Sequence, residues 1–320
     1  MLAVTVIGGY LGAGKTTLVN HLLRHANGAK LAVLVNEFGD LPIDADLIEG
    51  KSDNVISISG GCVCCSFGSD LIGALMDLPQ VSSDIDHVLI EASGVALPRS
   101  IADSVSLLPD YHMDGIAVVA DTSTLRNQAI DRYIGDTIER QLEAADLLIL
   151  NKVDLVDDET LQAVAAFTDE KAPRARRLRA ENGAVPVDIL LSPGPRTDDS
   201  DQGTHAHDHE HEHLHVDDPY LRMTLSPSRI ERPPAFAEAL ATSAEGLLRA
   251  KGFFDAADGS RMLLQIVGDR WSVTPSPGTP GNPRLVFIGV RERMSEEAIT
   301  NIITAHETQC DSNAQGETAP

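Results

Sequence analysis

The first part of the chain alternates short β-rich runs with stretches of helical periodicity. Strands are predicted at Ala3–Ile7, Leu31–Val35, Val55–Ile58, His87–Ile90, Gly115–Ala120, Asp146–Leu150 and Val187–Leu191. Helices are predicted between them, at Lys15–His25, Asp70–Leu78, Pro98–Leu107, Leu125–Ala145 and Asp158–Phe167. This alternation predicts an α/β fold with a mostly parallel sheet that helices cover on both faces. Ligands of such sheets bind at the carboxyl ends of the strands.

The composition changes abruptly after residue 191. Residues 192–218 are rich in Pro, Gly, Asp and His and are predicted to form a linker between residues 1–191 and a second domain. That domain, residues 219–309, is predicted to be a smaller α+β unit, with strands at Tyr220–Leu225, Met262–Val267, Arg270–Val273 and Leu285–Val290 and helices at Pro234–Thr242 and Ser295–His306. The polar residues 310–320 are predicted to be a disordered tail.

The chain of 320 residues has a formal net charge of −23, which limits its partners. Binding to nucleic acid or to an anionic membrane needs clusters of Lys and Arg, so we expect neither. No apolar run approaches the roughly 20 residues of a membrane-spanning helix, and the N-terminal residues lack the features of a targeting segment. We therefore expect a cytoplasmic protein.

A phosphate-binding pattern, Gly-x-x-x-x-Gly-Lys-Thr, follows the first predicted strand and opens a helix. Glycines let backbone N–H groups surround phosphates, and the helix N-terminus adds a positive dipole. Lys15 is expected to contact the β- and γ-phosphates, and Thr16 to bind Mg²⁺. The alternative is an ordinary Gly-rich turn, which the position of the pattern disfavours. The residues assigned to this loop are Gly9, Gly12, Ala13, Gly14, Lys15, Thr16 and Thr17.

Two further predicted strands end in residues that could bind a nucleotide or its Mg²⁺ ion. The apolar strand that ends at Glu91 resembles the strand of P-loop proteins whose terminal carboxylate supports the Mg²⁺ ion. Glu91 is therefore a catalytic candidate together with Lys15 and Thr16. Gly94, three residues later, can approach the γ-phosphate. A later strand ends in Asn151-Lys152-Val153-Asp154. The carboxylate of Asp154 can accept from guanine N1–H and its exocyclic amine together, which adenine cannot offer. Lys152 would lie along the base and Asn151 would tie loops together, so GTP is favoured over ATP.

Three of the four cysteines, Cys62, Cys64 and Cys65, lie within four positions after a Gly-Gly pair and form the cysteine cluster. Thiolates select Zn²⁺, Cu⁺ or Fe–S clusters over hard cations. Three ligands leave a tetrahedral ion one position short, and Glu37 is the candidate for it or for a supporting role. Packing cysteines and a redox dithiol are the alternatives. Glu37 belongs to the Asn36–Asp40 segment that follows the second predicted strand, and Asp40 or the nearby Asp44 could orient the hydrolytic water.

A histidine tract alternates His with mostly acidic residues. An extended chain would place its six imidazoles on one side, where they could bind metal weakly as an auxiliary site. A polar linker with incidental histidines is the alternative. The six residues are His205, His207, His209, His211, His213 and His215. By contrast, His21, His25 and His112 are expected to be surface or loop residues rather than ligands.

These motifs together resemble the CobW-type family of P-loop GTPases, which includes zinc chaperones and cobalamin-synthesis proteins. The resemblance also rests on Gln141 through Asp154, Arg249–Gly252 and Val286–Gly289; Ala92 departs from the threonine usual in the family. It implies a GTP-hydrolysing metallochaperone that uses GTP, Mg²⁺ and Zn²⁺ and transfers zinc from the cysteine cluster to a client metalloprotein.

Two other functions stay open at this point. Co²⁺ delivery for cobalamin synthesis ranks lower, because thiolate ligands and the Irving–Williams order favour Zn²⁺. A non-enzymatic metal buffer is disfavoured by the intact nucleotide motifs. The sequence also leaves the oligomeric state open, with a homodimer as one alternative.

Overall fold

The computed structural model describes residues 1–26, 28–35, 55–59, 69–82, 84–191, 219–279 and 281–308. The chain divides into two compact units, one on each side of the predicted linker. The linker, the tail and their boundaries lie outside the described residues, so the predicted domain limits stay predictions.

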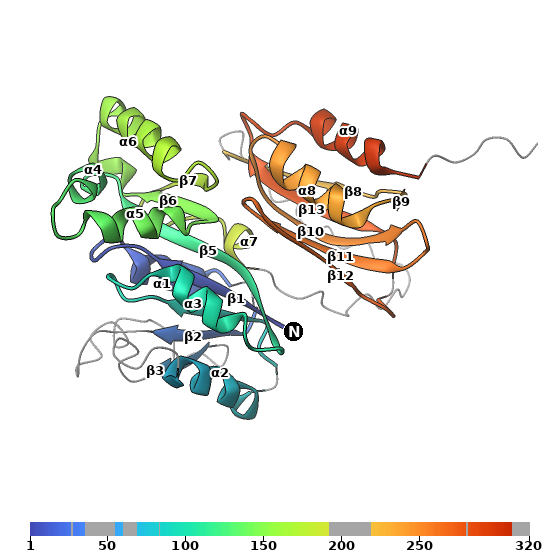
Figure 1. Ribbon diagram of the computed structural model, residues 1–320, viewed down its shortest axis with the longest axis horizontal. Coiled ribbons are helices and arrows are strands. Elements are labelled where there is room, and N and C mark those ends of the chain that lie inside the picture. The colour runs from blue at the N-terminus through green and yellow to red at the C-terminus, as the bar shows by residue number, and fades with distance from the viewer. Residues whose placement is uncertain are drawn as a thin grey trace, which may run out of the picture. The chain divides into compact units, whose positions relative to one another are not determined.

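The first unit contains a seven-stranded sheet in the order β3-β2-β4-β1-β5-β6-β7 (Figure 1). All six neighbouring pairs are parallel. Every residue of the β2, β4 and β6 strands is buried, as expected of a parallel sheet covered on both faces. The strands are β1 (Leu2–Gly8), β2 (Leu31–Val35), β3 (Val55–Ser59), β4 (His87–Glu91), β5 (Tyr111–Asp121), β6 (Leu147–Asn151) and β7 (Arg176–Ala180).

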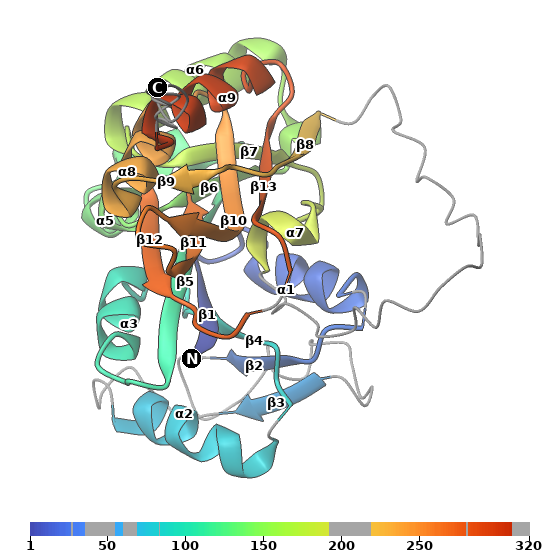
Figure 2. The same cartoon turned by 90° about the vertical axis from the view of Figure 1, so that its right-hand side faces the viewer.

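Helices cover both faces of this sheet (Figure 2). Val4 and Val6 of β1 share a core with Ile101 of the α3 helix. Thr5, between them on the opposite face, donates to the carbonyl of Leu190 in α7 (3.1 Å). The helices are α1 (Lys15–Arg24), α2 (Ser69–Val81), α3 (Pro98–Val105), α4 (Leu125–Ala129), α5 (Gly135–Glu143), the 3₁₀ helix η2 (Val153–Leu155), α6 (Asp158–Lys171) and α7 (Val187–Leu190).

The last strand of this sheet was wrongly predicted. Val187–Leu191 was expected to be a strand, but residues 187–190 form the helix α7. A short apolar run fits a strand or a buried helical turn equally well, and the acidic side chain of Asp188 in the first turn favours a helix. The edge position belongs instead to β7, whose sequence Arg-Arg-Leu-Arg-Ala has little strand character. Its only buried residues are Leu178 and Ala180.

The helix predicted over Leu125–Ala145 is two helices, α4 and α5. Gly135 begins the second of them, and a Cβ there would lie 2.5 Å from the Ala129 carbonyl oxygen at the end of the first. The close approach of the two helix ends therefore requires glycine at this position.

The second unit is a mostly antiparallel sheet in the order β12-β11-β10-β13-β8, with β9 added beside β10 in parallel. Two helices pack on it through a core that includes Phe236, Phe254 and Phe287. Its elements are β8 (Tyr220–Leu225), β9 (Arg229–Ile230), α8 (Pro233–Ser243), β10 (Leu247–Ala256), β11 (Arg261–Val267), β12 (Arg270–Pro275), β13 (Arg284–Val290) and α9 (Glu296–His306). The α+β class is confirmed, but the central strand β10 was not predicted.

Within the described ranges, no helix is both long and apolar enough to cross a bilayer.

Candidate nucleotide-binding site

The nucleotide motifs lie at one edge of the first sheet, where the strands β1, β4, β5 and β6 end. In the order of the sheet these four strands are adjacent, and their parallel pairing brings all their carboxyl ends to the same side. The fold therefore brings the loops after residues 8, 91, 121 and 151 together, although up to 143 residues of chain separate them.

The loop between β1 and α1 has the backbone that a phosphate cradle needs. Gly9 and Gly14 have φ angles of 129° and 105°, which side chains strongly disfavour. A Cβ at Gly9 would overlap the Val119 carbonyl, and one at Gly14 would overlap the side-chain amide of Asn151. The α1 helix then begins at Lys15 with no acidic side chain in its first turn, so the dipole at its N-terminus is not opposed there.

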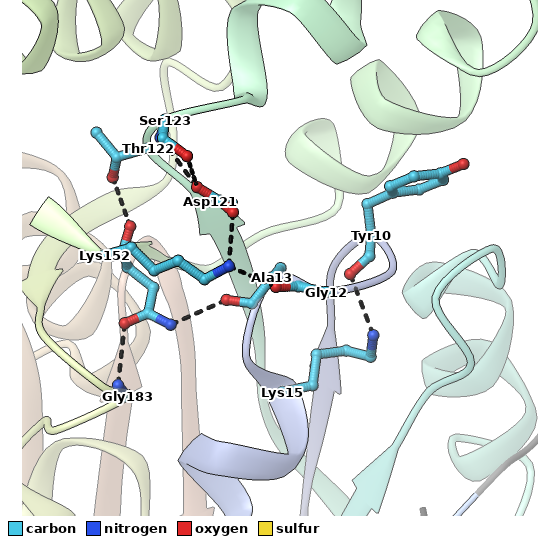
Figure 3. A network of polar contacts seen from close by, with 10 residues as sticks. Tyr10, Gly12, Ala13, Lys15, Asp121, Thr122, Ser123, Lys152 and Gly183 are labelled. Carbon is cyan, nitrogen blue, oxygen red and sulfur yellow. Dashed lines mark hydrogen bonds and ion pairs between the residues drawn. The ribbon is translucent and has the colours of Figure 1, made fainter. Parts of the chain in front are cut away.

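Lys15 and Thr16 open the α1 helix, and Thr16 contacts Glu91 at the end of β4. Lys15 is only 8% exposed, and its ammonium donates to the Tyr10 carbonyl across the loop (3.2 Å; Figure 3). The hydroxyl of Thr16 donates to Glu91 Oε1 at 2.7 Å. Glu91 is 3% exposed at the end of β4. The structure thus places a hydroxyl and a carboxylate in contact at the start of α1, where Lys15 is the preceding residue.

The segment after Glu91 packs directly against the phosphate-binding loop. A Cβ at Gly94 would lie 2.8 Å from the backbone nitrogen of Leu11. Gln141, a buried residue of α5, donates through Nε2 to the carbonyls of Gly94 (3.1 Å) and Ala96 (2.9 Å). Gln141 therefore uses both of its N–H groups to hold this segment beside the loop.

Asn151 joins three segments of the site. Its side-chain nitrogen donates to the Ala13 carbonyl, and its side-chain oxygen accepts from the Gly183 N–H, each at 2.9 Å. Its backbone carbonyl accepts from the Thr122 hydroxyl at 2.7 Å. With 1% of its surface exposed, Asn151 is the buried tie between loops that its position in the motif predicts.

Lys152 lies across the phosphate-binding loop. Its ammonium donates to the Gly12 carbonyl (2.8 Å) and to Asp121 Oδ2 (2.7 Å; Figure 3). Burial of Asp121 raises the pKa of its carboxyl, but hydrogen bonds from Lys152 and Ser123 outweigh burial and leave this pKa below its ordinary value. An ionised Asp121 therefore holds Lys152 in place at neutral pH.

Among the site residues that the structure describes, Gly12, Thr17 and Asp154 are exposed. Asp154 is exposed in η2, three residues after the buried Asn151, and Thr17 is exposed in the first turn of α1. The carboxylate of Asp154 can therefore meet a base that lies over Lys152.

The predicted metal site lies outside the described residues. This holds for the cysteine cluster, for Glu37 and its neighbours Asp40 and Asp44, and for the histidine tract. The described ranges hold no group of three or more His, Cys, Asp or Glu side chains that could bind a metal ion.

Three residues that contact the site were not predicted from the sequence as site residues. Asp121 ends β5 as Glu91 ends β4, so the same strand-end rule applied to β5 would have found it. Gly183 follows β7, which was not predicted, although its Asn-Gly dipeptide is a turn signal. Gln141 was noted only as part of the family resemblance, and no local pattern indicates what its amide contacts.

The fold and this site define the first unit as a P-loop nucleotide-binding domain. Residues 3–179 match the family described as CobW/HypB/UreG, nucleotide-binding domain, and residues 222–306 match the cobalamin synthesis protein cobW C-terminal domain. The chain belongs to the CobW/HypB/UreG family, and the resemblance seen in its sequence is confirmed.

Several relatives in this family are named as zinc chaperones or as zinc-regulated GTPases. The zinc chaperone CobW of Sinorhizobium sp is 33% identical over 350 aligned positions, which cover 95% of this chain and 97% of the relative. The zinc-regulated GTPase metalloprotein activator 1 of Dictyostelium discoideum is 32% identical over 60% of this chain and 48% of its own length. Among solved structures, the Zn(II)-bound YjiA GTPase from E. coli is 21% identical, with a TM-score of 0.44 over 96% of this chain and 99% of that one.

Proposed function

We propose that this protein is a GTP-hydrolysing metallochaperone that binds zinc at the cysteine cluster and transfers it to a client protein. The observation that carries the nucleotide part is the hydrogen bonding of Asn151 and Lys152 to the carbonyls of Ala13 and Gly12. These bonds tie the guanine-recognition motif to the phosphate-binding loop. The phosphate and base subsites are thereby held as one unit.

Phosphate binding is assigned to the loop of Gly9, Gly12, Ala13 and Gly14 together with the first turn of α1. Lys15 would leave the Tyr10 carbonyl and contact the β- and γ-phosphates, because an anion is a stronger partner for an ammonium than a neutral carbonyl is. Thr17 would contact phosphate from the exposed side of the same turn. Gly94, held by Gln141, offers its backbone to the γ-phosphate without a side chain in the way.

Thr16 and Glu91 suit Mg²⁺. A hydroxyl and a carboxylate oxygen 2.7 Å apart are hard oxygen ligands, which Mg²⁺ prefers over nitrogen and sulfur. The ion would neutralise charge that develops on the transferred phosphoryl group. Thr16 would bind through its hydroxyl, and Glu91 would support it from the end of β4.

Guanine selectivity is assigned to Asp154. Its exposed carboxylate would accept two hydrogen bonds from guanine, and the alkyl chain of Lys152 would lie against the base. Replacing Asp154 with alanine should weaken GTP binding at least about tenfold, since two hydrogen bonds to a charged group are lost. Asp157→Ala is the matched control. Asp157 caps α6 by accepting from the Thr160 N–H (2.8 Å), so its loss should lower stability slightly and leave the preference for GTP over ATP unchanged.

The metal part of the proposal rests on the cysteine cluster and on the zinc names of the relatives. Three thiolates suit Zn²⁺ that must be passed on, with Glu37 as a fourth ligand, and the histidine tract would capture zinc weakly. We place this activity in the cytoplasm, where thiols stay reduced.

GTP hydrolysis would control release of the ion through the Glu37 and Gly94 segments. Such coupling is reciprocal, so a GTP analogue that tightens zinc binding must itself be bound tighter, by the same factor, when zinc is present. The test is an anaerobic Zn²⁺ titration with a GTP analogue and with GDP, using the full chain and its Cys64→Ala variant. We expect nucleotide-dependent affinity that Cys64→Ala abolishes. Equal affinity in the two nucleotide states would refute the coupling, and an unchanged tight site in Cys64→Ala would refute the cysteine assignment.

A further inference from the structure

Two histidines lie one helical turn apart at the end of α1. His21 is in the last turn of the helix, and His25 is its C-terminal cap. Their ring centres lie 4.4 Å apart, with 35° between the ring planes. Both are on the surface, His21 partly exposed and His25 exposed. Nothing in the proposed nucleotide or zinc chemistry uses them.

Each ring is hydrogen-bonded to a backbone carbonyl. His21 Nε2 lies 2.9 Å from the carbonyl oxygen of Val185, and His25 Nδ1 lies 2.8 Å from that of His21. A carbonyl oxygen can only accept, so the nitrogen facing it must carry the proton. In the neutral rings, the lone pairs are therefore on His21 Nδ1 and His25 Nε2. Histidine ligands of metals almost always have this arrangement, with one nitrogen donating to a carbonyl or carboxylate and the other free to bind.

The spacing of the rings suits one shared ion. A metal–nitrogen bond of about 2.0–2.1 Å places the ion roughly 3.2 Å from the centre of each imidazole. Two imidazoles bound at angles between about 90° and the tetrahedral value of about 109° then have ring centres about 4.5–5.2 Å apart. The observed separation of 4.4 Å is close to the short end of this range. Pairs of His at i and i+4 on a helix are also a recurrent zinc-binding arrangement.

The charges around the pair favour a neutral ligand set. Burial is the main cause that lowers the pKa of His21, so this ring is neutral at pH 7. The C-terminus of α1 attracts a cation, whereas the nearby Arg24 repels one.

We propose that His21 and His25 form a second metal site, which binds one borderline divalent cation such as Zn²⁺ through His21 Nδ1 and His25 Nε2. Water would fill its remaining positions, because no third His, Cys, Asp or Glu joins the pair among the described residues. With two protein ligands the site exchanges its ion readily. It lies on the helix that begins at Lys15, so zinc is held on the same element that binds phosphate. The site needs neither the cysteine cluster nor GTP hydrolysis.

The experiment measures Zn²⁺ binding to a full-length variant that lacks the other two predicted metal sites. In a background variant, the three cysteines of the cluster become serine and the six histidines of the tract become asparagine. Calorimetric titration with Zn²⁺ alone at pH 7.5 should show one site. His21→Gln and His25→Gln should each weaken it at least about tenfold, since removing a ligand costs at least as much as removing its support.

His306→Gln is the matched control. His306 also donates Nδ1 to the carbonyl four residues earlier (2.8 Å from Ile302 O), but its ring neighbour is Phe236. This variant should bind Zn²⁺ as the background does. Nitrogen-15 spectra of the imidazoles give a second readout, in which the two predicted tautomers should be present and only their signals should shift with Zn²⁺. Absence of zinc binding in the background variant, or equal binding in His25→Gln, would overturn the proposal without affecting the proposed function.

Discussion

Replacing Asn151 with aspartate removes one hydrogen bond of the nucleotide site and keeps another. Aspartate has the same shape, so its oxygen can still accept from the Gly183 N–H. The second oxygen replaces the amide nitrogen that donates to the Ala13 carbonyl at 2.9 Å. Two acceptors then face each other in a position that is 1% exposed in the native protein. The perturbation therefore acts on the phosphate-binding loop and spares the contact with Gly183.

The expected cost has two parts. Leaving the buried Ala13 carbonyl without its donor costs about 1–3 kcal/mol. Burying an ionised carboxylate beside a carbonyl adds to this and raises the pKa of the introduced carboxyl. A group whose pKa is higher in the folded state favours folding most below its unfolded pKa, near 4, and loses this contribution as pH rises. The destabilisation by Asn151→Asp should therefore be smallest near pH 4 and grow toward pH 8.

Two assays measure the effect. Urea unfolding at pH 5 and pH 8 should show a larger deficit in the free energy of unfolding at pH 8. Equilibrium binding of a fluorescent GTP analogue at pH 8 should weaken about tenfold or more, because 1.4 kcal/mol corresponds to a factor of ten.

Asn127→Asp is the control for added charge, since Asn127 is exposed on α4 and the same substitution there should change neither quantity measurably. A pH-independent deficit in Asn151→Asp, or GTP affinity equal to that of the native protein, would show that the Ala13 contact does not organise the loop.

Three further substitutions test the site. Gly14→Ala places a Cβ on the Asn151 amide at a φ of 105°, so calorimetry should detect little or no GTP binding, whereas normal affinity would refute the steric argument. In native protein, the depressed pKa of Asp121 contributes stability above about pH 4 that is lost as pH falls through its folded pKa. Asp121→Asn should lack this part of the urea-monitored pH dependence, and an identical pH profile would contradict the ion pair with Lys152. Gln141→Leu leaves two carbonyls of the loop after β4 without donors, so steady-state assays should show a lower kcat for GTP hydrolysis with a nearly unchanged KM; a rise in KM alone would instead indicate a role in binding.

The sequence predicted the helices and strands whose hydrophobic pattern is clear. Six strands of the first sheet follow from apolar runs, and the phosphate-binding loop follows from the glycine pattern after the first of them. The errors fall where the local pattern is weak. The edge strand β7 is rich in arginine, because an edge strand needs only a few buried side chains. The short apolar run at 187–191 is compatible with a buried helical turn as well as with a strand.

By itself, the sequence determined the fold class, the family and the residue types that can bind phosphate, Mg²⁺ and guanine. These features are local, since a strand end, a turn and a helix start lie within a few residues of one another. Only the tertiary structure decided which distant groups meet. Gln141 reaches Gly94, Lys152 reaches Asp121, and Asn151 joins Ala13 to Gly183 because parallel pairing aligns the ends of four strands. Those contacts depend on the order of strands in the sheet, which no short stretch of the chain encodes.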